Sequence, residues 1–363
     1  MVFFDYQVLE NTVNFIYKNT LDPEQACKSL LIMLEKKNLN ILKSIYIVGC
    51  VGINHLRYLE ILERKYKERN EKINIEIPEE IKERRKSINA SRLSLMIDDG
   101  DENDSKIIKF NDNFVMENKS EEEIADFFFY LKEKDILYNP DGLLYEYSKK
   151  IIEYTNIKEL EEVAIISLYK LMCISSEFFT EYKHFISKGF KSDNYKIRSN
   201  CIISIGDFLL LYNSMVDEIN ILFEGLIDTN KIVRKNALLV IYNLLKRNIL
   251  RLGNKSIYLS NLIFDEDEEI KLISRNIIYN MSENDNFIVT LVYEKFVKEI
   301  NNSDLDFFLP LLKEKSREMI FLKLIKTSQN KDMLKVMYNK FNMSEKFIND
   351  IKHMEEFKIL GVC

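Results

Sequence analysis

The sequence contains few residues that interrupt helices, with only 9 Gly and 4 Pro among 363 residues. Folds rich in β-structure need many such residues at their turns, so this scarcity favours long helices joined by short polar turns. Trp is absent, and the heavy use of Asn, Ile, Lys, Tyr and Phe is typical of an AT-rich genome rather than of a function. Because 46% of the residues are hydrophobic, the chain can still bury a sizeable core.

Cysteine and histidine are too sparse and too scattered to indicate a metal centre. The five Cys are far apart and form no CxxC, and the three His lie near none of them in ligand spacing. This pattern disfavours a disulfide framework and a zinc site, and it predicts a reducing compartment. We expect no metal and no cofactor.

Targeting and catalytic motifs are also missing from the sequence. The N-terminus has no basic region followed by an apolar core, and no window offers 18 uncharged apolar residues, so we expect no signal peptide and no membrane span. The stretch Gly49–Gly52 lacks the spacing of a phosphate loop and is more typical of close packing between helices. HExxH, DxDxDG and GxSxG do not occur, so the sequence predicts a protein that is not an enzyme.

Hydrophobic periodicity divides the chain into three segments. Residues 1–77 predict helical repeats with breaks near Pro23 and Asn38. Residues 78–119 lose the periodicity and carry separate basic and acidic runs, which predicts a flexible linker. The basic run at 82–86 is interpreted as a solvated segment rather than a nuclear import signal. Periodicity returns at Ser120, where Ser120-Glu-Glu-Glu123 forms a capping box, and residues 120–363 predict a second helical segment.

Three segments of the second half repeat one another at a fixed period. They begin at Ile197, Val233 and Ile270, so they are offset by 36 and 37 residues. Four columns keep this period: an aliphatic residue, a basic residue, a small residue and a polar residue. The last three columns contain Arg198, Arg234 and Lys271; Cys201, Ala237 and Ser274; and Asp207, Asn243 and Asn280.

This repetition is typical of HEAT repeats, so the sequence predicts an all-α, HEAT-repeat α-solenoid with an armadillo-like superhelix. Asp228 and Asp265 each precede an aliphatic residue by five positions, and we expect them to cap the second helix of their repeats. We expect the small residues to allow close helix approach. The basic column should pair with the polar column of a neighbouring repeat.

A basic window interrupts this acidic protein, whose formal net charge is -6. No Asp or Glu occurs between Thr229 and Phe264. A helix rises about 1.5 Å per residue, so Lys235 and Lys246 span ~16 Å, enough to reach successive phosphates of a duplex. Duplex contact and simple solvation remain alternatives for this window. The candidate DNA-binding residues are Lys231, Lys235, Lys246, Arg247 and Arg251.

Several stretches resemble the C-terminal HEAT region of the condensin subunit 1 family. Residues 197–208 resemble its IRSN run followed by GDL, residues 233–238 its VRKxA run, and residues 264–270 its acidic DEDE turn. Residues 43–53, 133–144 and 168–176 are similar to its LFxVGHVAI, EKELLYG…LL and LxKLMCVSS segments. Cys50 replaces the family's His, and the family's basic turn shortens to 249–253, where only Arg251 is basic.

The resemblance implies a regulatory subunit of condensin in mitotic chromosome condensation, with a nuclear and chromosomal location. It implies SMC ATPase subunits, a kleisin subunit, the second HEAT subunit and double-stranded DNA as partners, the DNA being bound without sequence preference. ATP hydrolysis would belong to the SMC partners. Alternatives are the equivalent subunit of the second condensin complex and a HEAT-repeat scaffold or transport adaptor of importin or adaptin type.

Overall fold

The computed structural model describes residues 2–36, 40–76, 120–212, 219–298, 301–327 and 331–358. Every regular element within these residues is a helix, and they contain no strand, which confirms the predicted all-α class. Two compact units divide the chain, Met1–Lys183 and His184–Cys363. The predicted linker, 78–119, lies outside the described residues.

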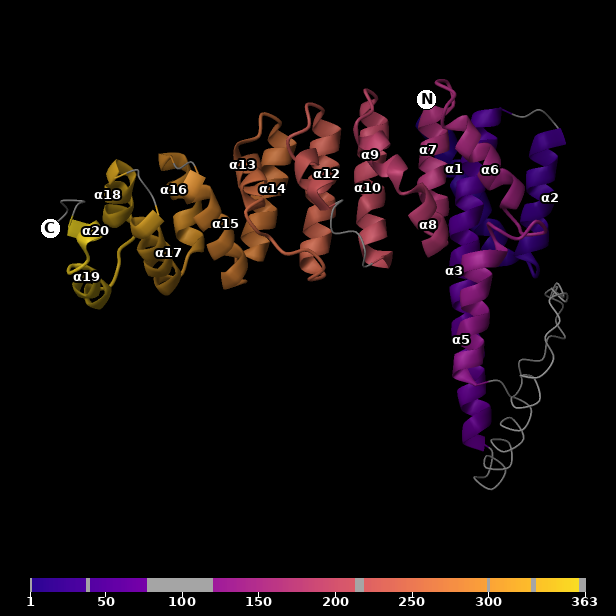
Figure 1. The fold of residues 1–363 in the computed structure, drawn as a ribbon, viewed down its shortest axis with the longest axis horizontal. Helices are drawn as coiled ribbons and strands as arrows, with labels where there is room; N and C mark the ends of the chain where they lie inside the picture. Colours follow the sequence, from indigo (N-terminus) through magenta and orange to yellow (C-terminus); the bar gives the residue numbers. More distant parts are fainter. Residues whose placement is uncertain are drawn as a thin grey trace. The chain divides into compact units, whose positions relative to one another are not determined.

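The first unit is a helical array built around one long helix (Figure 1). Its elements are α1 (Val2–Asn19), α2 (Pro23–Lys36), α3 (Ile41–Glu76), α5 (Glu121–Tyr130), the π-helical η1 (Leu131–Asp135), α6 (Tyr145–Tyr154), α7 (Glu161–Met172) and α8 (Ser176–Tyr182). Helix α3 packs against α1, α5 and α7. The contacts therefore join helices from both sides of 77–119 in one compact unit.

The centre of the first unit is the close approach of α3 to α7. A Cβ atom added at Gly49 would lie 3.0 Å from the backbone Cα of Ser167, and one at Gly52 would lie 2.8 Å from Cδ1 of Ile174. The Ser167 hydroxyl also donates a 2.8 Å hydrogen bond to the carbonyl of Ile45. These contacts confirm that Gly49–Gly52 is a helix-packing point.

Within the described residues, the stretch Ile41–Arg69 of α3 is long and apolar enough by composition to cross a membrane. However, 56% of its apolar window is buried inside the protein. Its buried side chains include Ile45, Val48 and Val51. The composition of α3 is therefore that of a core helix whose apolar face is covered by α1 and α7.

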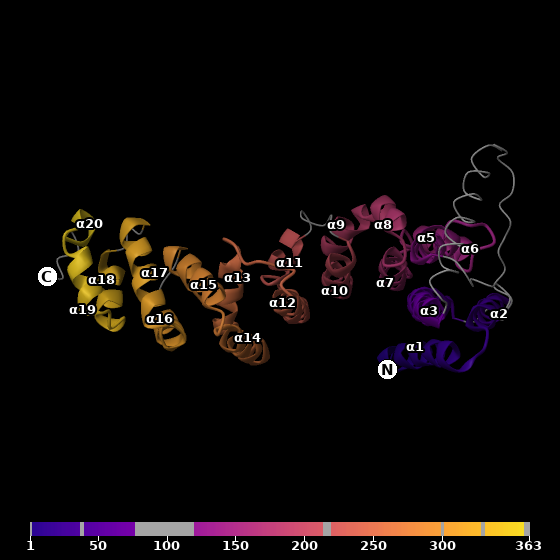
Figure 2. The ribbon, with the colours of Figure 1, turned by 90° about the horizontal axis from the view of Figure 1, so that it is seen from below.

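The second unit consists of short helices stacked in pairs (Figures 1 and 2). Its elements are α9 (His184–Phe190), α10 (Tyr195–Leu211), α11 (Ile219–Gly225), α12 (Lys231–Lys246), α13 (Ser256–Asn261), the 3-10 helix η2 (Leu262–Phe264), α14 (Glu268–Met281), α15 (Asp285–Lys298), α16 (Asn302–Phe308), the 3-10 helix η3 (Leu309–Leu311), α17 (Glu314–Thr327), α18 (Lys331–Lys340), α19 (Glu345–Ile351) and α20 (Glu355–Lys358).

The repeats predicted from the sequence are the pairs α9/α10, α11/α12 and α13/α14. Helices α10, α12 and α14 lie side by side in one layer and their partners lie in the other (Figure 2). The small-residue column, which is 0% exposed, faces the partner layer. Cys201 and Ser274 donate to the carbonyls of Ile186 on α9 and Leu262 on η2, and a Cβ atom added at Gly225 of α11 would lie 3.0 Å from Cβ of Ala237. The prediction of this column as the site of close helix approach is confirmed.

An arginine ladder links successive repeats. Arg198 donates from Nε and Nη2 to the two carboxylate oxygens of Asp228 in the next repeat, at 2.7 and 2.8 Å. Arg234 makes the same two bonds to Asp265, at 2.9 and 2.8 Å. Each Arg also donates from Nη1 to carbonyl oxygens of its own turn. Planar guanidinium groups suit such bidentate pairing, so the ladder fixes the spacing of adjacent repeats.

Two predictions about these residues were wrong: the partners of the basic column and the caps of the second helices. The arginines pair with the turn aspartates rather than with the polar column. These aspartates do not cap the second helices: the caps are Asn194, Asn230 and Asp267, while Asp228 and Asp265 accept the N–H groups of Asn230 and Asp267. Lys271 lacks the planar fork of Arg and instead pairs with Glu268 of its own helix.

Candidate nucleic-acid interface

Helix α12 carries three of the five candidate DNA-binding residues, Lys231, Lys235 and Lys246, and a fourth, Arg247, is its C-cap. It begins at the Asn230 cap, whose side chain accepts the Ile232 N–H. Val233, Ala237 and Leu238 turn its apolar face into the core, where each is 0% exposed. Burying a side chain the size of Val or Leu stabilises the fold by roughly 1.5–3 kcal/mol, so the helix is held rigidly enough to position its terminal cations.

The end of α12 is a Schellman turn. Asn248 has a left-handed backbone with φ of 58°, and its N–H bonds to the Leu245 carbonyl. The next N–H, of Ile249, reaches back to the Leu244 carbonyl at 3.0 Å. Asn tolerates this conformation better than most residues, which explains the abrupt change in chain direction. The turn brings Arg251 five residues beyond the last helical residue, Lys246.

The two ends of α12 differ in their charge environment. At its start, Lys231 lies 3.0 Å from the Asp267 carboxylate, and Lys235 forms an ion pair with Glu269. Asp267 is the N-cap of α14 and Glu269 belongs to its first turn, so both acids come from the next repeat. The hydrogen bond from Lys231 holds the pKa of Asp267 below its usual value, which keeps this carboxylate ionised. The carboxylates offset both lysine charges.

At its other end, α12 presents exposed cations. Lys246, Arg247 and Arg251 are exposed, and none of them forms an ion pair with a carboxylate in the described part of the chain. The Arg247 Nε donates to Oδ1 of Asn243 at 3.0 Å, which leaves its other guanidinium N–H groups directed to solvent or to a ligand. The structure therefore divides the five candidates into two groups, with the unpaired group at the end of α12.

The ladder arginines do not add to this patch. Arg198 and Arg234 have side-chain exposures of 15% and 14%, and their partner carboxylates are more deeply covered. Burial of Asp228 opposes its ionisation, but the hydrogen bonds from Arg198 and the Asn230 N–H, together with the charges of Arg198 and Arg234, hold its pKa below the usual value. Arg198 and Arg234 are thus structural cations, as the repeat pattern predicts.

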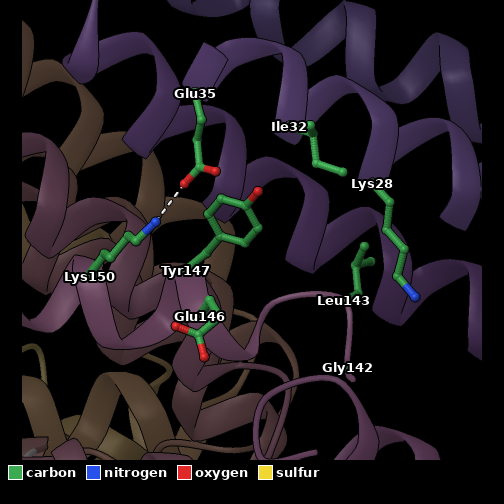
Figure 3. A pocket seen from close by; sticks show the side chains of 8 residues that line it. All are labelled: Lys28, Ile32, Glu35, Gly142, Leu143, Glu146, Tyr147 and Lys150. Carbon is green, nitrogen blue, oxygen red and sulfur yellow. Dashed lines mark hydrogen bonds and ion pairs between the residues drawn. The ribbon is translucent and has the colours of Figure 1, made fainter. Parts of the chain in front are cut away.

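The first unit contains a separate hollow of about 290 Å³ between α2 and α6 (Figure 3). Its rim carries two lysines and two glutamates around Ile32, Leu143 and Tyr147. Lys150 crosses the hollow to Glu35 at 2.6 Å, as the dashed line shows. The opposite charges balance, so this hollow lacks the net positive charge that a nucleic acid needs. No cluster of three metal-binding side chains occurs in the described ranges.

Comparison with known proteins shows which family the repeats resemble. The family model for non-SMC mitotic condensation complex subunit 1 matches residues 196–360. Condensin complex subunit 1 of Schizosaccharomyces pombe is 23% identical over 261 residues, which cover 70% of this chain and 20% of that protein. Its Saccharomyces cerevisiae counterpart is 23% identical over 293 residues, covering 78% of this chain and 23% of that protein. The Xenopus laevis protein is 27% identical over 136 residues, covering 37% and 10%.

The stacked helix pairs, their laddered turns and the family match define an α-solenoid of the HEAT-repeat class. More particularly, the chain is similar to the condensin complex subunit 1 family, through the family model over residues 196–360 and through the two yeast proteins over 70% and 78% of its length. This is a family of non-SMC subunits and not of enzymes. The chain spans about a fifth of the length of the first two relatives.

Proposed function

We propose that the protein serves as a regulatory, non-catalytic subunit of a condensin complex. The match of residues 196–360 to the non-SMC condensation family carries this proposal, because it covers α10 to α20, including the laddered repeats. In this role the solenoid holds SMC ATPase subunits and a kleisin subunit on extended surfaces, next to the second HEAT subunit. Solenoids suit such scaffolding, since each repeat adds surface without changing the core. The protein would act in the nucleus, on chromosomes.

Affinity purification of the tagged protein from nuclear extract, followed by mass spectrometry, tests this assignment. SMC and kleisin subunits should be recovered together in amounts comparable to the bait. The kleisin class distinguishes the first condensin complex from the second. Recovery of transport cargo, nucleoporins or coat components instead would support the adaptor alternative and contradict the proposal.

We also propose that the end of α12 contacts duplex DNA. Lys246, Arg247 and Arg251 are exposed together at one helix end, without carboxylate partners in the described residues. Lys231 and Lys235 have a secondary role, because duplex phosphates must compete with Asp267 and Glu269 for them. Contact would be limited to the phosphate backbone, because the patch is a helix end and turn without a groove-reading helix.

A further inference from the structure

The contact between α3 and α7 brings a cysteine and a lysine together. Lys170 on α7 places its Nζ 3.3 Å from Sγ of Cys50 on α3. The two residues are 120 positions apart in the chain, so only the packing of the two helices pairs them. Cys50 is 2% exposed, whereas Lys170 is half-buried. The pair belongs neither to the arginine ladder nor to the cations at the end of α12.

Neighbouring side chains hold the Lys170 amino group against the sulfur. Its Nζ lies 4.1 Å from the centre of the Tyr46 ring, a distance at which a cation is attracted to the ring face. Tyr46 lies one helical turn before Cys50, so the ring and the sulfur share one side of α3. The Tyr46 hydroxyl donates to Oε2 of Glu10 at 3.2 Å, which restrains the ring. The lysine stem is also packed, since a Cβ atom added at Gly49 would lie 3.1 Å from its Cδ.

The separation of nitrogen and sulfur is that of a pair of atoms poised to react. Groups held roughly 3–3.5 Å apart in a fixed orientation form a bond without paying for their encounter. An oxidised cysteine, as sulfenic acid, condenses with a nearby nitrogen to give a sulfenamide. Lys170, as its free amine, supplies such a nitrogen next to Cys50.

The reaction balances in two steps, with a hydroperoxide as the oxidant. In the first, Sγ of Cys50 attacks one oxygen of hydrogen peroxide, the O–O bond breaks, and the thiol becomes a sulfenic acid while the peroxide is reduced to water. In the second, the lone pair of the Lys170 amine attacks Sγ and the S–O bond breaks. The departing hydroxyl takes one amine proton and leaves as water. The thiol and the amine therefore lose one hydrogen each.

Burial sets the rate and the selectivity of this reaction. Burial raises the pKa of the Cys50 thiol, although the charge of Lys170 opposes the shift. Oxidation is therefore slower than at an exposed thiol of ordinary pKa. At 2% exposure, Cys50 is closed to bulky thiols, whereas hydrogen peroxide is close to water in size. The sulfenic acid is thus held beside the amine and away from competing thiols in solution.

We propose that Cys50 and Lys170 form an oxidation site, at which a hydroperoxide joins α3 to α7 through an S–N bond. The bond replaces a hydrogen bond at the centre of the first unit by a covalent link. Oxidation then fixes the α3–α7 contact, and a thiol reductant releases it. The proposal is independent of the condensin assignment and of the DNA contact, which use other residues.

Peptide mapping of the full chain after treatment with hydrogen peroxide tests this proposal. Tandem mass spectrometry of the tryptic digest should show a joined species that contains Cys50 and Lys170. Its mass should equal the sum of the two reduced peptides less two hydrogens, and dithiothreitol should split it. On a gel without reductant, the denatured joined chain should migrate faster, because the bond closes a loop between the two positions.

Three variants sharpen the test. Cys50→Ser removes the sulfur and Lys170→Arg keeps the charge without the reactive amine, so both should lose the joined species. The matched control Cys173→Ser removes another free thiol of the same unit and should cross-link like the wild type. Circular dichroism and melting temperature establish that each variant is folded, and Lys170→Arg carries the test if Cys50→Ser is less stable.

Three results would overturn the proposal. One is the absence of the joined species, with Cys50 either unchanged or oxidised to sulfinic or sulfonic acid. Another is a disulfide between Cys50 and a second cysteine as the main product. The third is a joined species that retains an oxygen atom, because condensation to an S–N bond releases that oxygen as water.

Discussion

Arg198 and Asp228 lie 30 positions apart in the chain and meet through two parallel hydrogen bonds of 2.7 and 2.8 Å. Because the Arg198 side chain is 15% exposed and that of Asp228 is 7% exposed, solvent screens this pair only weakly. The same relationship recurs between Arg234 and Asp265. Repetition makes the pair a junction element of the solenoid rather than an isolated surface contact.

Loss of a ladder arginine should destabilise the second unit. We expect Arg198→Ala to lower the free energy of unfolding by about 3 kcal/mol, since it leaves a largely buried carboxylate without its partner. Urea denaturation followed by circular dichroism measures this change. The control Lys231→Ala removes a lysine whose side chain is 67% exposed and should cost less than about 1 kcal/mol. Equal effects of the two substitutions would contradict the structural role of the ladder.

Acid should weaken the same junction. The folded-state pKa of Asp228 is depressed, so its ionised form contributes stability above the unfolded value near 3.9. As pH falls below that value, the unfolded chain takes up the proton first, and the contribution disappears through the folded pKa. Asp228→Asn should therefore make the free energy of unfolding depend less on pH below about pH 4. The urea midpoint measured from pH 6 down to pH 3 tests this, and a variant with the wild-type slope would argue against it.

His55 should make the first unit sensitive to milder acid. Burial lowers its pKa from 6.5 to about 4, so the folded protein holds it neutral. The unfolded chain takes up a proton from about pH 6.5 downward while the folded chain does not, so stability falls between pH 6.5 and about 4, by roughly 3 kcal/mol in full.

Thermal melts across this pH range test the role of His55. The readout for His55→Phe is the slope of melting temperature against pH, rather than the melting temperature itself. This variant keeps a ring beside Tyr17 but cannot titrate. We expect the variant to lose most of the slope between pH 6.5 and about 4. His353→Gln changes an exposed histidine and should retain it.

The approach of α3 to α7 should not accept a methyl group at Gly49. A Cβ there would lie 3.0 Å from the Ser167 backbone, which cannot swing aside as a side-chain end would. We expect Gly49→Ala to cost about 1–3 kcal/mol, because overpacking outweighs the better helix propensity of Ala. Gly253→Ala is the control, since nothing lies within 4 Å of its added Cβ. Differential scanning calorimetry compares the two variants, and an unchanged melting temperature for Gly49→Ala would contradict the close packing.

Reversal of the cations at the end of α12 should weaken DNA binding. The triple variant Lys246→Glu, Arg247→Glu and Arg251→Glu should bind duplex DNA less tightly, independently of its sequence. Each lost phosphate contact should reduce the slope of log affinity against log salt by about 0.9. Titrations at several salt concentrations give both quantities.

A matched charge reversal elsewhere in the second unit distinguishes the loss of this contact from a change in net charge. Lys315→Glu, Lys326→Glu and Lys335→Glu change the charge by the same amount at exposed positions of α17 and α18. This control should keep nearly the wild-type slope. If the two triple variants bind alike while folded, the patch on α12 makes no specific contact with DNA.

The sequence predicted the repeats well because their columns follow from helix geometry. A small residue every 36 or 37 positions is needed wherever two helices touch closely, and Cys201, Ala237 and Ser274 are indeed fully buried. The capping box at Ser120 is also present, with the Ser hydroxyl accepting the Glu123 N–H and the Glu123 carboxylate accepting the Ser120 N–H. Such features depend on residues close in sequence or on one fixed period.

The charge pairing was harder to predict because it joins residues from different repeats. The window 229–264 has no acids of its own, yet Lys231 and Lys235 meet acids 36 and 34 positions ahead. The true caps, Asn194, Asn230 and Asp267, follow the same period as the other columns and could have been found from it. The DNA contact, the partners and the independence of the predicted domains stay predictions.

The ladder stops where Lys271 turns back to Glu268. Beyond α14, one buried polar contact between neighbouring helices is the pair of Lys295 and Asp304, whose closest atoms are 3.7 Å apart, supported by a 2.8 Å bond from Lys295 to Asn261. A solenoid pulled along its axis carries the load through each junction in turn. The α10–α12 and α12–α14 junctions are each held by an Arg–Asp pair with two hydrogen bonds, so we expect them to resist shear. Of the helices in the second unit, we expect those after α14 to separate first under tension.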